Sequence, residues 1–420
     1  MPAGTRLKGD TLKLETYIFT IIVDIFFITI ENTHMGNIIN LFLIILCTSP
    51  SFALGEGDRN LLLIGLMSLS PIFLYKKIHN LKYECILLIF CSLIILNPLI
   101  FHPDSIRWST MLYSCMFCLF FISFTRIFSK RAYNISKYER ILKFILYLYF
   151  FVLLIQQFCV LVGLPIFNLN NYDITTPWKL NSMSSEPSHT ARFVAVLMYS
   201  LLLIQDNIAQ RKLSLKESYC QNKYQWLSFL WVMITSISGT AMLLLLVILL
   251  RYINRKYFFR SFITAFIVVI LFFTIDFKPI ERVKNITYAT LTLDKDAMIE
   301  ADHSAALRLV PMIVCVENID IFSLDGWIGK GVDYASKIMS NEIFGVPEGY
   351  TSGGCLLLAL EYGLFPFFII IYFTSSICIH KEQKIQSFIL WLFCCFFLGV
   401  NSQIAWSYIF LSYINKKLSK

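Results

Sequence analysis

A carboxylate, an imidazole and a guanidinium follow one another at three-residue intervals near the middle of the chain. They are Glu186, His189 and Arg192, and Pro187 suits the first position of a helix that would carry them. Residues at this spacing share one broad face of a helix. A carboxylate or imidazole can take a proton from a hydroxyl, and a guanidinium can bind anionic oxygens. The segment therefore indicates proton transfer on an anionic substrate.

The same segment also has a plainer interpretation. Glu186, or Ser185 before it, suits the position that caps a helix N-terminus, because oxygen atoms there accept bonds from free backbone N–H groups. In favour of chemistry, ionisable groups at the edge of an apolar run are costly unless they face a wet cavity. Both interpretations remain open on the residues alone.

Arg308 is a second candidate for binding an anion. It lies within Ala301–Val316, which has the pattern of an amphipathic helix lying on a membrane surface and broken at Pro311. One interpretation is that the Arg308 side chain extends along the bilayer surface into water. The other is that its planar guanidinium binds phosphate oxygens in pairs. Arg282 lies in the same polar stretch.

A glycine-rich turn follows at residues 325–331, with the sequence DGWIGKG. Outside a strand–turn–helix unit, such a turn is weak evidence for nucleotide binding. We interpret it as a loop that approaches another part of the chain closely. The chain has no HExxH motif and no second CxxC pair to complete Cys115 and Cys118, so we expect no metal site and no cofactor.

The elements that position these residues must lie in a membrane. Hydrophobic residues make up 57% of the 420 residues and charged residues only 15%, against roughly 25% charged in soluble domains. Apolar runs such as Phe144–Val162, Phe262–Ile275 and Leu364–Ile379 approach the about 20 residues that a helix needs to cross a bilayer. The composition predicts an all-α, polytopic integral membrane protein.

The net charge of +9 is concentrated in short segments beside the apolar runs. Basic residues placed in this way anchor loops in the cytoplasm, and they exclude nucleic acid as the partner. The clusters are Lys130, Arg131, Lys137, Arg140 and Lys143; Arg211, Lys212, Lys216 and Lys223; and Arg251, Arg255, Lys256 and Arg260.

Placing the basic segments in the cytoplasm predicts a single membrane domain over residues 1–420 with about twelve spans. Residues 164–191 and 276–354 then form two loops on the opposite face, the second one large. Trp226–Leu250 is basic at both flanks, so we expect a helical hairpin. Its polar tip, residues 238–240, would face the protein interior.

Three runs near the N-terminus are further candidate spans, namely Tyr17–Ile30, Ile38–Leu54 and Leu61–Tyr75. The first contains Asp24, and an even number of spans suits the flanking basic residues better, so one of the three would be re-entrant or interfacial.

The order of several motifs resembles the Wzy-type O-antigen polymerases, members of the O-antigen polymerase/ligase superfamily. The resemblance covers roughly residues 140–415. It consists of the Ser185-Glu-Pro-Ser188 segment entering a helix, the Ser238-Gly-Thr240 tip before a leucine-rich run, Arg308 ahead of the glycine-rich turn, Gly353-Gly354, and the turn at Asn401.

This resemblance implies a metal-independent glycosyltransferase of GT-C-like fold in a bacterial inner membrane, with its active site facing the periplasm. Its substrate would be an oligosaccharide linked to undecaprenyl diphosphate, and its product a longer surface polysaccharide. Besides the bilayer, a membrane protein that regulates chain length would be a partner.

The resemblance also implies roles for individual residues. Glu186 or His189 would be the catalytic base, and Arg192, Arg308 and Arg282 would bind the diphosphate. The supporting residues would be Ser188, Ser238, Thr240, His303 and Asn401.

Two other functions compete with polymerisation. An O-antigen ligase uses the same donor and the same leaving group, but His303 lacks the glycine spacing of a ligase-like histidine motif. A flippase or transporter for lipid-linked glycans would need several charged residues within the bilayer and internal symmetry. Here only Asp24 and Glu361 fall within apolar runs, and no repeat is visible.

Overall fold

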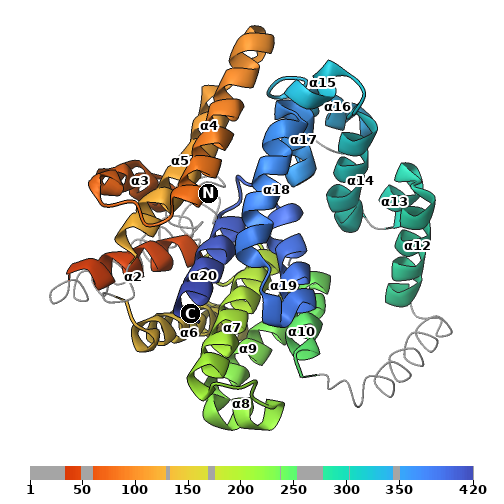
Figure 1. The fold of residues 1–420 in the computed structure, drawn as a ribbon. Helices are drawn as coiled ribbons and strands as arrows, with labels where there is room; N and C mark the ends of the chain where they lie inside the picture. Colours follow the sequence, from red (N-terminus) through yellow and green to blue (C-terminus); the bar gives the residue numbers. More distant parts are fainter. Residues whose placement is uncertain are drawn as a thin grey trace, which may run out of the picture.

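A computed structural model describes residues 34–48, 60–128, 133–168, 176–236, 238–252, 278–301, 303–343 and 351–419. Within these ranges every regular element is a helix (Figure 1). Among the described residues, four helices are long and apolar enough to cross a membrane. They are α4 (Leu81–Phe101), α5 (Trp108–Ile127), α6 (Ile135–Val162) and α7 (Pro187–Ala209). The chain therefore has the architecture of a helical membrane protein.

A fifth span is possible if one bent pair is counted as a single crossing. The pair joins α18 (Leu364–Cys378) to a segment built from η4 (Lys381–Gln383), α19 (Lys384–Trp391) and the π-helical η5 (Leu392–Phe396), at an angle of 86°. The chain therefore bends by about a right angle between these two segments.

Shorter apolar helices complete the bundle. They are α2 (His34–Cys47), α3 (Leu61–Leu69) with η1 (Ser70–Tyr75), and α10 (Gly239–Leu250). The expected spans Tyr17–Ile30 and Phe262–Ile275, and with them Asp24, lie outside the described residues. The total of about twelve spans remains a prediction.

Local sequence signals set the ends of α6. The Asn134 side chain accepts a hydrogen bond from the backbone N–H of Lys137 at 2.9 Å, which caps the first turn. The helix ends at Gly163, whose φ of +72° costs little because glycine has no Cβ. Part of the basic cluster that we placed in a loop therefore lies inside α6, where Lys143 pairs with Glu139 at 2.6 Å.

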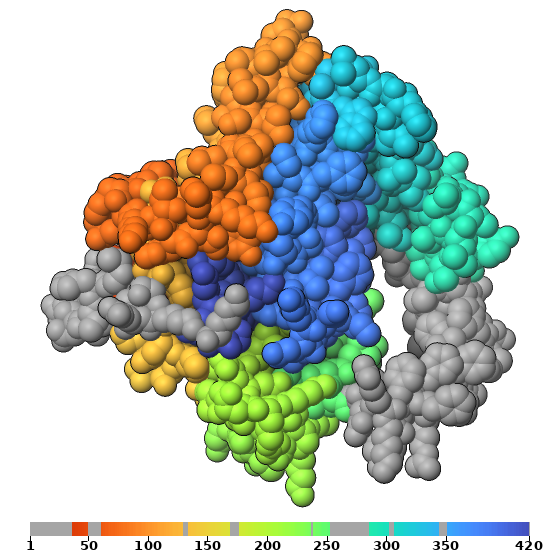
Figure 2. All heavy atoms as spheres, in the orientation of Figure 1, coloured from red at the N-terminus to blue at the C-terminus, as the bar shows by residue number. Residues whose placement is uncertain are grey.

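The centre of the bundle is formed by α7 and α20 (Gln403–Leu418), which pack against each other. Almost every residue of α20 from Ile404 onward is buried, and Trp406 stacks on Phe117 of α5 with ring centroids 5.5 Å apart. Figure 2 shows the C-terminal helices in the middle of the visible face, between the N-terminal third and the helices of the large loop. The packing of α20 against α7 holds α7 in place.

The expected hairpin is confirmed, but the expectation that its tip faces the protein interior is wrong, because Gly239 is exposed and Ser238 and Thr240 are only half-buried. The hairpin consists of α9 (Lys223–Thr235) and α10, and the rings of Trp226 and Tyr252 at its open end lie 6.0 Å apart. Ser238 caps α10 by accepting a bond from Ala241 N at 3.1 Å. Trp231 of α9 donates to Gln157 of α6 at 2.9 Å, which fastens the hairpin to its neighbour.

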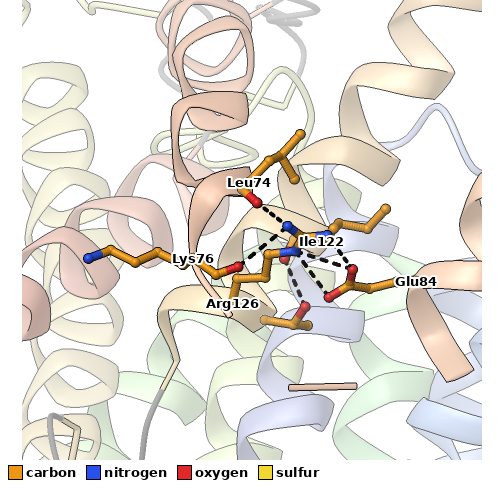
Figure 3. A network of polar contacts seen from close by, with 6 residues as sticks. Leu74, Lys76, Glu84, Ile122 and Arg126 are labelled. Atoms are coloured by element: carbon orange, nitrogen blue, oxygen red, sulfur yellow. Dashed lines mark hydrogen bonds and ion pairs between the residues drawn. The ribbon is translucent and has the colours of Figure 1, made fainter. Parts of the chain in front are cut away.

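A closed ion pair joins α4 and α5 at one end (Figure 3). Arg126 Nη2 lies 2.6 Å from Glu84 Oε2, and the Glu84 side chain is only 3% exposed. Arg126 also donates to the backbone carbonyls of Leu74 and Lys76. A buried carboxylate is stable only when it is fully paired, and this one is.

The large loop folds into a layer of short helices along one side of the bundle (Figure 1). These are α12 (Lys278–Thr292), α13 (Lys295–Ala301), α14 (His303–Glu317), α15 (Leu324–Ile328) and α16 (Tyr334–Glu342), followed by α17 (Cys355–Tyr362). Ala306, Val310 and Val314 of α14 join Ala289 and Met298 in a small apolar core. The loop is thus a folded layer.

The expected break of α14 at Pro311 is wrong, because the helix continues from His303 to Glu317. Proline removes one backbone donor and crowds the preceding turn. Packing of Val310 and Val314 into the small core on either side of the proline outweighs that cost. The apolar face of α14 therefore contacts protein helices, which differs from the expected helix lying on a membrane surface.

Candidate functional site

The site begins at the N-terminus of α7. Pro187 is the first helical residue, as expected, and Glu186 occupies the capping position. However, the Glu186 side chain makes no capping bond to the backbone. Its Oε2 atom instead accepts a hydrogen bond from Ser188 Oγ at 2.9 Å. The capping interpretation thus describes the position of Glu186 but not the contacts of its carboxylate.

Arg308 comes to the same carboxylate from the large loop. Its Nη2 atom lies 3.9 Å from Glu186 Oε2, and the two side chains are 49% and 38% exposed. Charge-assisted hydrogen bonds are shorter, about 2.7–2.9 Å, so the two side chains attract each other without forming a hydrogen bond. We call such an arrangement an open pair. The structure therefore brings together two sequence candidates from distant segments at a surface open to solvent.

Arg192 lies behind this pair, nearly two turns into α7. It is only 5% exposed, and its Nε atom has no hydrogen-bond partner in the described part of the chain. Burying a guanidinium away from water is costly unless an anion or acceptors compensate. Because Arg192 is close enough to influence the pKa of Glu186, the buried cation belongs to the same electrostatic cluster.

The electrostatics of the cluster keep Glu186 ionised. Partial burial alone raises the pKa of this carboxyl, since burial disfavours charge. His189 when its imidazole is protonated, the hydrogen bond from Ser188 and the charges of Arg308 and Arg192 act in the opposite direction. Together they outweigh burial and place the pKa of Glu186 below its usual value. At neutral pH the site holds a carboxylate among cations.

His189 completes the ionisable face. Its Nδ1 atom is hydrogen-bonded to Ser185 Oγ at 3.0 Å, and which atom donates depends on the tautomer. The imidazole is half-buried one turn after Glu186. Of the sequence candidates whose side chains the structure describes, five therefore share this site: Glu186, Ser188, His189, Arg192 and Arg308.

A buried floor under the site was not anticipated. Residues 181–184 of the first loop are at most 2% exposed. Gln156 of α6 fixes them: its Nε2 donates to the carbonyls of Phe167 and Ser182, and its Oε1 accepts from Ser182 N at 2.8 Å. Ser182 Oγ also donates to Tyr149 O at 2.7 Å. This network sets the point from which α7 starts.

The signal for this floor was present in the sequence. Gln156 and Gln157 interrupt an otherwise apolar run, and polar residues inside membrane helices are costly unless they bond to a partner. Gln156 bonds to the loop and Gln157 to Trp231 of the hairpin. A glutamine pair in a span is therefore a sign of tertiary hydrogen bonds.

Other predicted residues have local contacts elsewhere. Ser238 caps α10, and Thr240 is half-buried in the first turn of that helix. The Asn401 side chain accepts a hydrogen bond from Ser114 of α5. The side chains of Arg282 and His303 lie outside the described residues.

The glycine-rich turn packs closely against another part of the chain, as expected. A Cβ at Gly329 would lie 2.3 Å from the carbonyl oxygen of Glu361, and one at Gly363 would lie 2.1 Å from that of Trp327. The backbone N–H groups of Lys330 and Gly331 donate to the last carbonyls of α17. Since these donors are used within the protein, the turn does not offer them to a phosphate.

The remaining glycine pair connects the loop layer to the bundle. Gly354 has a φ of +61°, and a Cβ there would lie 2.2 Å from the carbonyl oxygen of Phe396 at the end of η5. A Cβ at Gly353 would lie 2.8 Å from the sulfur of Cys315 in α14. Close backbone contact at this pair therefore fixes α14, the helix of Arg308, against the bundle.

Among the described residues, no group of three or more His, Cys, Asp or Glu side chains is placed to hold a metal ion. Comparisons of the chain with protein-family models, with curated proteins and with solved structures found no match.

Proposed function

We propose that the protein is an O-antigen polymerase, which joins oligosaccharide repeat units linked to undecaprenyl diphosphate at the periplasmic face of a bacterial inner membrane. The observation that carries this proposal is the meeting of Arg308 with Glu186, in front of the buried Arg192. The site thus combines a proton acceptor with cations beside a helical membrane bundle, as transfer from a lipid-linked diphosphate requires.

The cations suit the leaving group. When the glycosidic carbon leaves its diphosphate, negative charge develops on the phosphate oxygens and must be stabilised. Arg308 is exposed enough to reach an incoming diphosphate, and Arg192 is buried with an Nε that has no partner among the described residues. We assign Arg308 and Arg192 to the diphosphate, with Arg282 as a further candidate.

The catalytic base becomes more basic when Arg308 exchanges its partner Glu186 for the diphosphate. When Arg308 turns to the diphosphate, Glu186 loses a cation that lowers its pKa, and its basicity rises. Glu186 or His189 then takes the proton from the hydroxyl of the acceptor sugar. The oxygen forms a bond to the anomeric carbon of the donor, the bond to the diphosphate breaks, and undecaprenyl diphosphate leaves with the electron pair.

The architecture is compatible with lipid-linked substrates. A site at the end of α7 allows the polyprenyl tails to stay in the bilayer while the sugars meet beneath the loop layer. We further propose about twelve spans, a GT-C-like arrangement, transfer without a metal ion, and a chain-length regulator protein as partner.

The test is the lipopolysaccharide profile of cells lacking the gene, separated by gel electrophoresis. A polymerase predicts loss of the ladder, with the core carrying one repeat unit, and return of the ladder on complementation. Bare core with accumulated lipid-linked polymer would identify a ligase instead. An unchanged ladder would overturn the proposal.

A further inference from the structure

The loop layer exposes an apolar stretch at the start of α15. Ile321, Phe322 and Leu324 are each more than half exposed, and Phe322 reaches 93%. We call residues 321–327 the α15 segment. A contiguous group of large apolar side chains on a surface marks a place that another apolar body covers.

Trp327 joins the α15 segment to α18. Its ring centroid lies 4.9 Å from that of Phe365 and 6.3 Å from that of Phe368, and both phenylalanines are about half exposed. Its indole Nε1 donates to the carbonyl oxygen of Ile321 at 2.9 Å, so the polar atom of the ring is used within the segment. The exposed side chains of the α15 segment therefore continue the exposed aromatic surface of α18.

The depth of this surface can be measured against α4, which is long enough to cross a membrane. Towards one end of α4, Asn97 Nδ2 donates to the carbonyl oxygen of Tyr362, just before α18, at 3.0 Å. Near the other end, the rings of Tyr83 and Phe373 lie 5.8 Å apart. The two phenylalanines that Trp327 contacts lie between these points on α18. Trp327 therefore packs within the depth that α4 spans.

The helix α18 is too short to cross the bilayer beside α4. The 21 residues of α4 rise about 31 Å and the 15 residues of α18 about 22 Å, against a hydrocarbon core of about 30 Å. The α15 segment extends the apolar surface at the end where α18 begins (Figure 1). There, His102 Nε2, just after α4, lies 2.7 Å from the carbonyl oxygen of Gly329, just after α15.

The backbone of the α15 segment has partners of its own. The N–H of Phe322 donates to the Asp320 carboxylate at 2.9 Å, and that of Gly326 donates to Ser323 Oγ at 3.2 Å. Backbone outside a helix can enter a membrane only when its polar groups are bonded within the protein. Because the carboxylates of Asp320 and Asp325 are costly in hydrocarbon, insertion must be shallow, with both acids at the level of the headgroups.

We propose that the α15 segment inserts its apolar side chains into the membrane leaflet at the C-terminal end of α4 and anchors the loop layer there. The partner is lipid hydrocarbon, because the segment continues the surface of a membrane bundle and carries a tryptophan, which favours the membrane interface. The helix α17 packs against both α15 and α14, so the anchor also holds the helix that carries Arg308. The proposal does not depend on the activity assigned to Glu186.

The first test places the photoreactive residue p-benzoylphenylalanine in place of Phe322 in the full-length chain, in phosphatidylcholine nanodiscs. The matched position is Asn341, an exposed residue of α16 in the same layer, next to the ion pair of Glu342 with Lys295. Mass spectrometry after irradiation measures protein that carries phospholipid. We expect at least about tenfold more phospholipid adduct at position 322 than at position 341.

The second test asks whether insertion holds the layer. The variant Phe322→Ser/Leu324→Ser is compared with Tyr288→Ser/Leu291→Ser, which removes two exposed apolar side chains from α12. Amide hydrogen exchange of residues 319–329 is measured in nanodiscs by mass spectrometry. It should be at least about tenfold faster than wild type in the first variant and unchanged in the second.

Equal phospholipid adduct at positions 322 and 341 would overturn the proposal, and so would a photo-adduct at position 322 to a second copy of the chain in place of lipid. Wild-type exchange in Phe322→Ser/Leu324→Ser would overturn it as well. If that variant does not fold, Leu324→Ser alone is held to the same criterion. Neither test measures glycan transfer, so failure of the anchor and failure of the proposed function are separate results.

Discussion

Two arginine–glutamate pairs in this protein differ in almost every physical respect. Arg126 and Glu84 are 2.6 Å apart and nearly buried, and Arg126 also bonds to two backbone carbonyls. Arg308 and Glu186 are 3.9 Å apart and are about half and two-fifths exposed. The first pair has its charges compensated within the protein. The second retains the capacity to exchange partners, which is what a substrate site needs.

The difference teaches how to tell a structural charge from a functional one in a membrane bundle. A buried ion that is fully paired holds elements together, and removing either partner exposes the other to an apolar environment. An open pair beside a buried cation, as with Arg192, contributes less stability, and under our proposal it binds an incoming anion.

The largest effect on stability should come from breaking the closed pair. Arg126→Ala leaves Glu84 buried without a cation, and such losses cost about 3–5 kcal/mol. Thermal unfolding in detergent, followed by tryptophan fluorescence, should show a much lower melting midpoint. Arg308→Ala is the matched control and should melt as the wild type does. Equal midpoints for the two variants would contradict the contrast between the pairs.

The next largest loss of stability should come from a glycine that fixes the loop layer, which brings Arg308 to Glu186. Gly363→Ala places a Cβ against the carbonyl of Trp327 at a φ of +97°, and we expect a loss of about 1–3 kcal/mol or more. Gly65→Ala is the control, since Gly65 occupies an exposed position of α3 and nothing would lie within 4 Å of its Cβ. Melting midpoints measure both, and an unaffected Gly363→Ala would show that the loop contact carries no strain.

Sequence patterns predicted the local features of this fold. Alternating apolar runs and basic segments predicted the main helices, the flanking charges predicted the hairpin of α9 and α10, and Pro187 marked the start of α7. These features depend on residues close together in the chain, which is why periodicity and capping rules find them.

Tertiary contacts were harder to predict. Nothing near Arg308 in the sequence indicates that it meets Glu186, because the contact depends on how the loop layer is seated through Gly354 and Gly363. Likewise, the buried floor depends on Gln156, and α14 continues through Pro311 because its neighbours pack on both sides. In each case tertiary packing outweighs a local preference.

A moderate effect should appear in the pH dependence of transfer. The lowered pKa keeps Glu186 ionised in the free protein, so kcat/KM should stay level from about pH 7 down to about pH 5 and fall only below that. The acidic limb of kcat should lie at higher pH, because bound diphosphate removes Arg308 from Glu186. Arg308→Gln should raise the acidic limb of kcat/KM, and Arg308→Lys should leave it nearly unchanged. Identical acidic limbs of kcat/KM in the wild type and both Arg308 variants would contradict the proposed exchange of partners.

The smallest effect should come from the exposed pair of Arg211 and Glu217, which are 58% and 40% exposed. Solvent screens such pairs, and they rarely contribute measurable stability. Arg211→Ala should therefore show the wild-type melting midpoint and the wild-type rate of transfer. A clear loss of either would mean that exposure is a poor guide to the role of these charges.

The most direct test uses purified full-length protein in nanodiscs with an undecaprenyl-diphosphate-linked repeat unit, and follows polymer length by gel electrophoresis. Glu186→Gln and Arg308→Ala should each lower the rate about 100- to 1000-fold, while their melting midpoints stay at the wild-type value. Arg211→Ala should polymerise normally. Wild-type polymer from both Glu186→Gln and Arg308→Ala would contradict the assignment of the open pair as the site of transfer.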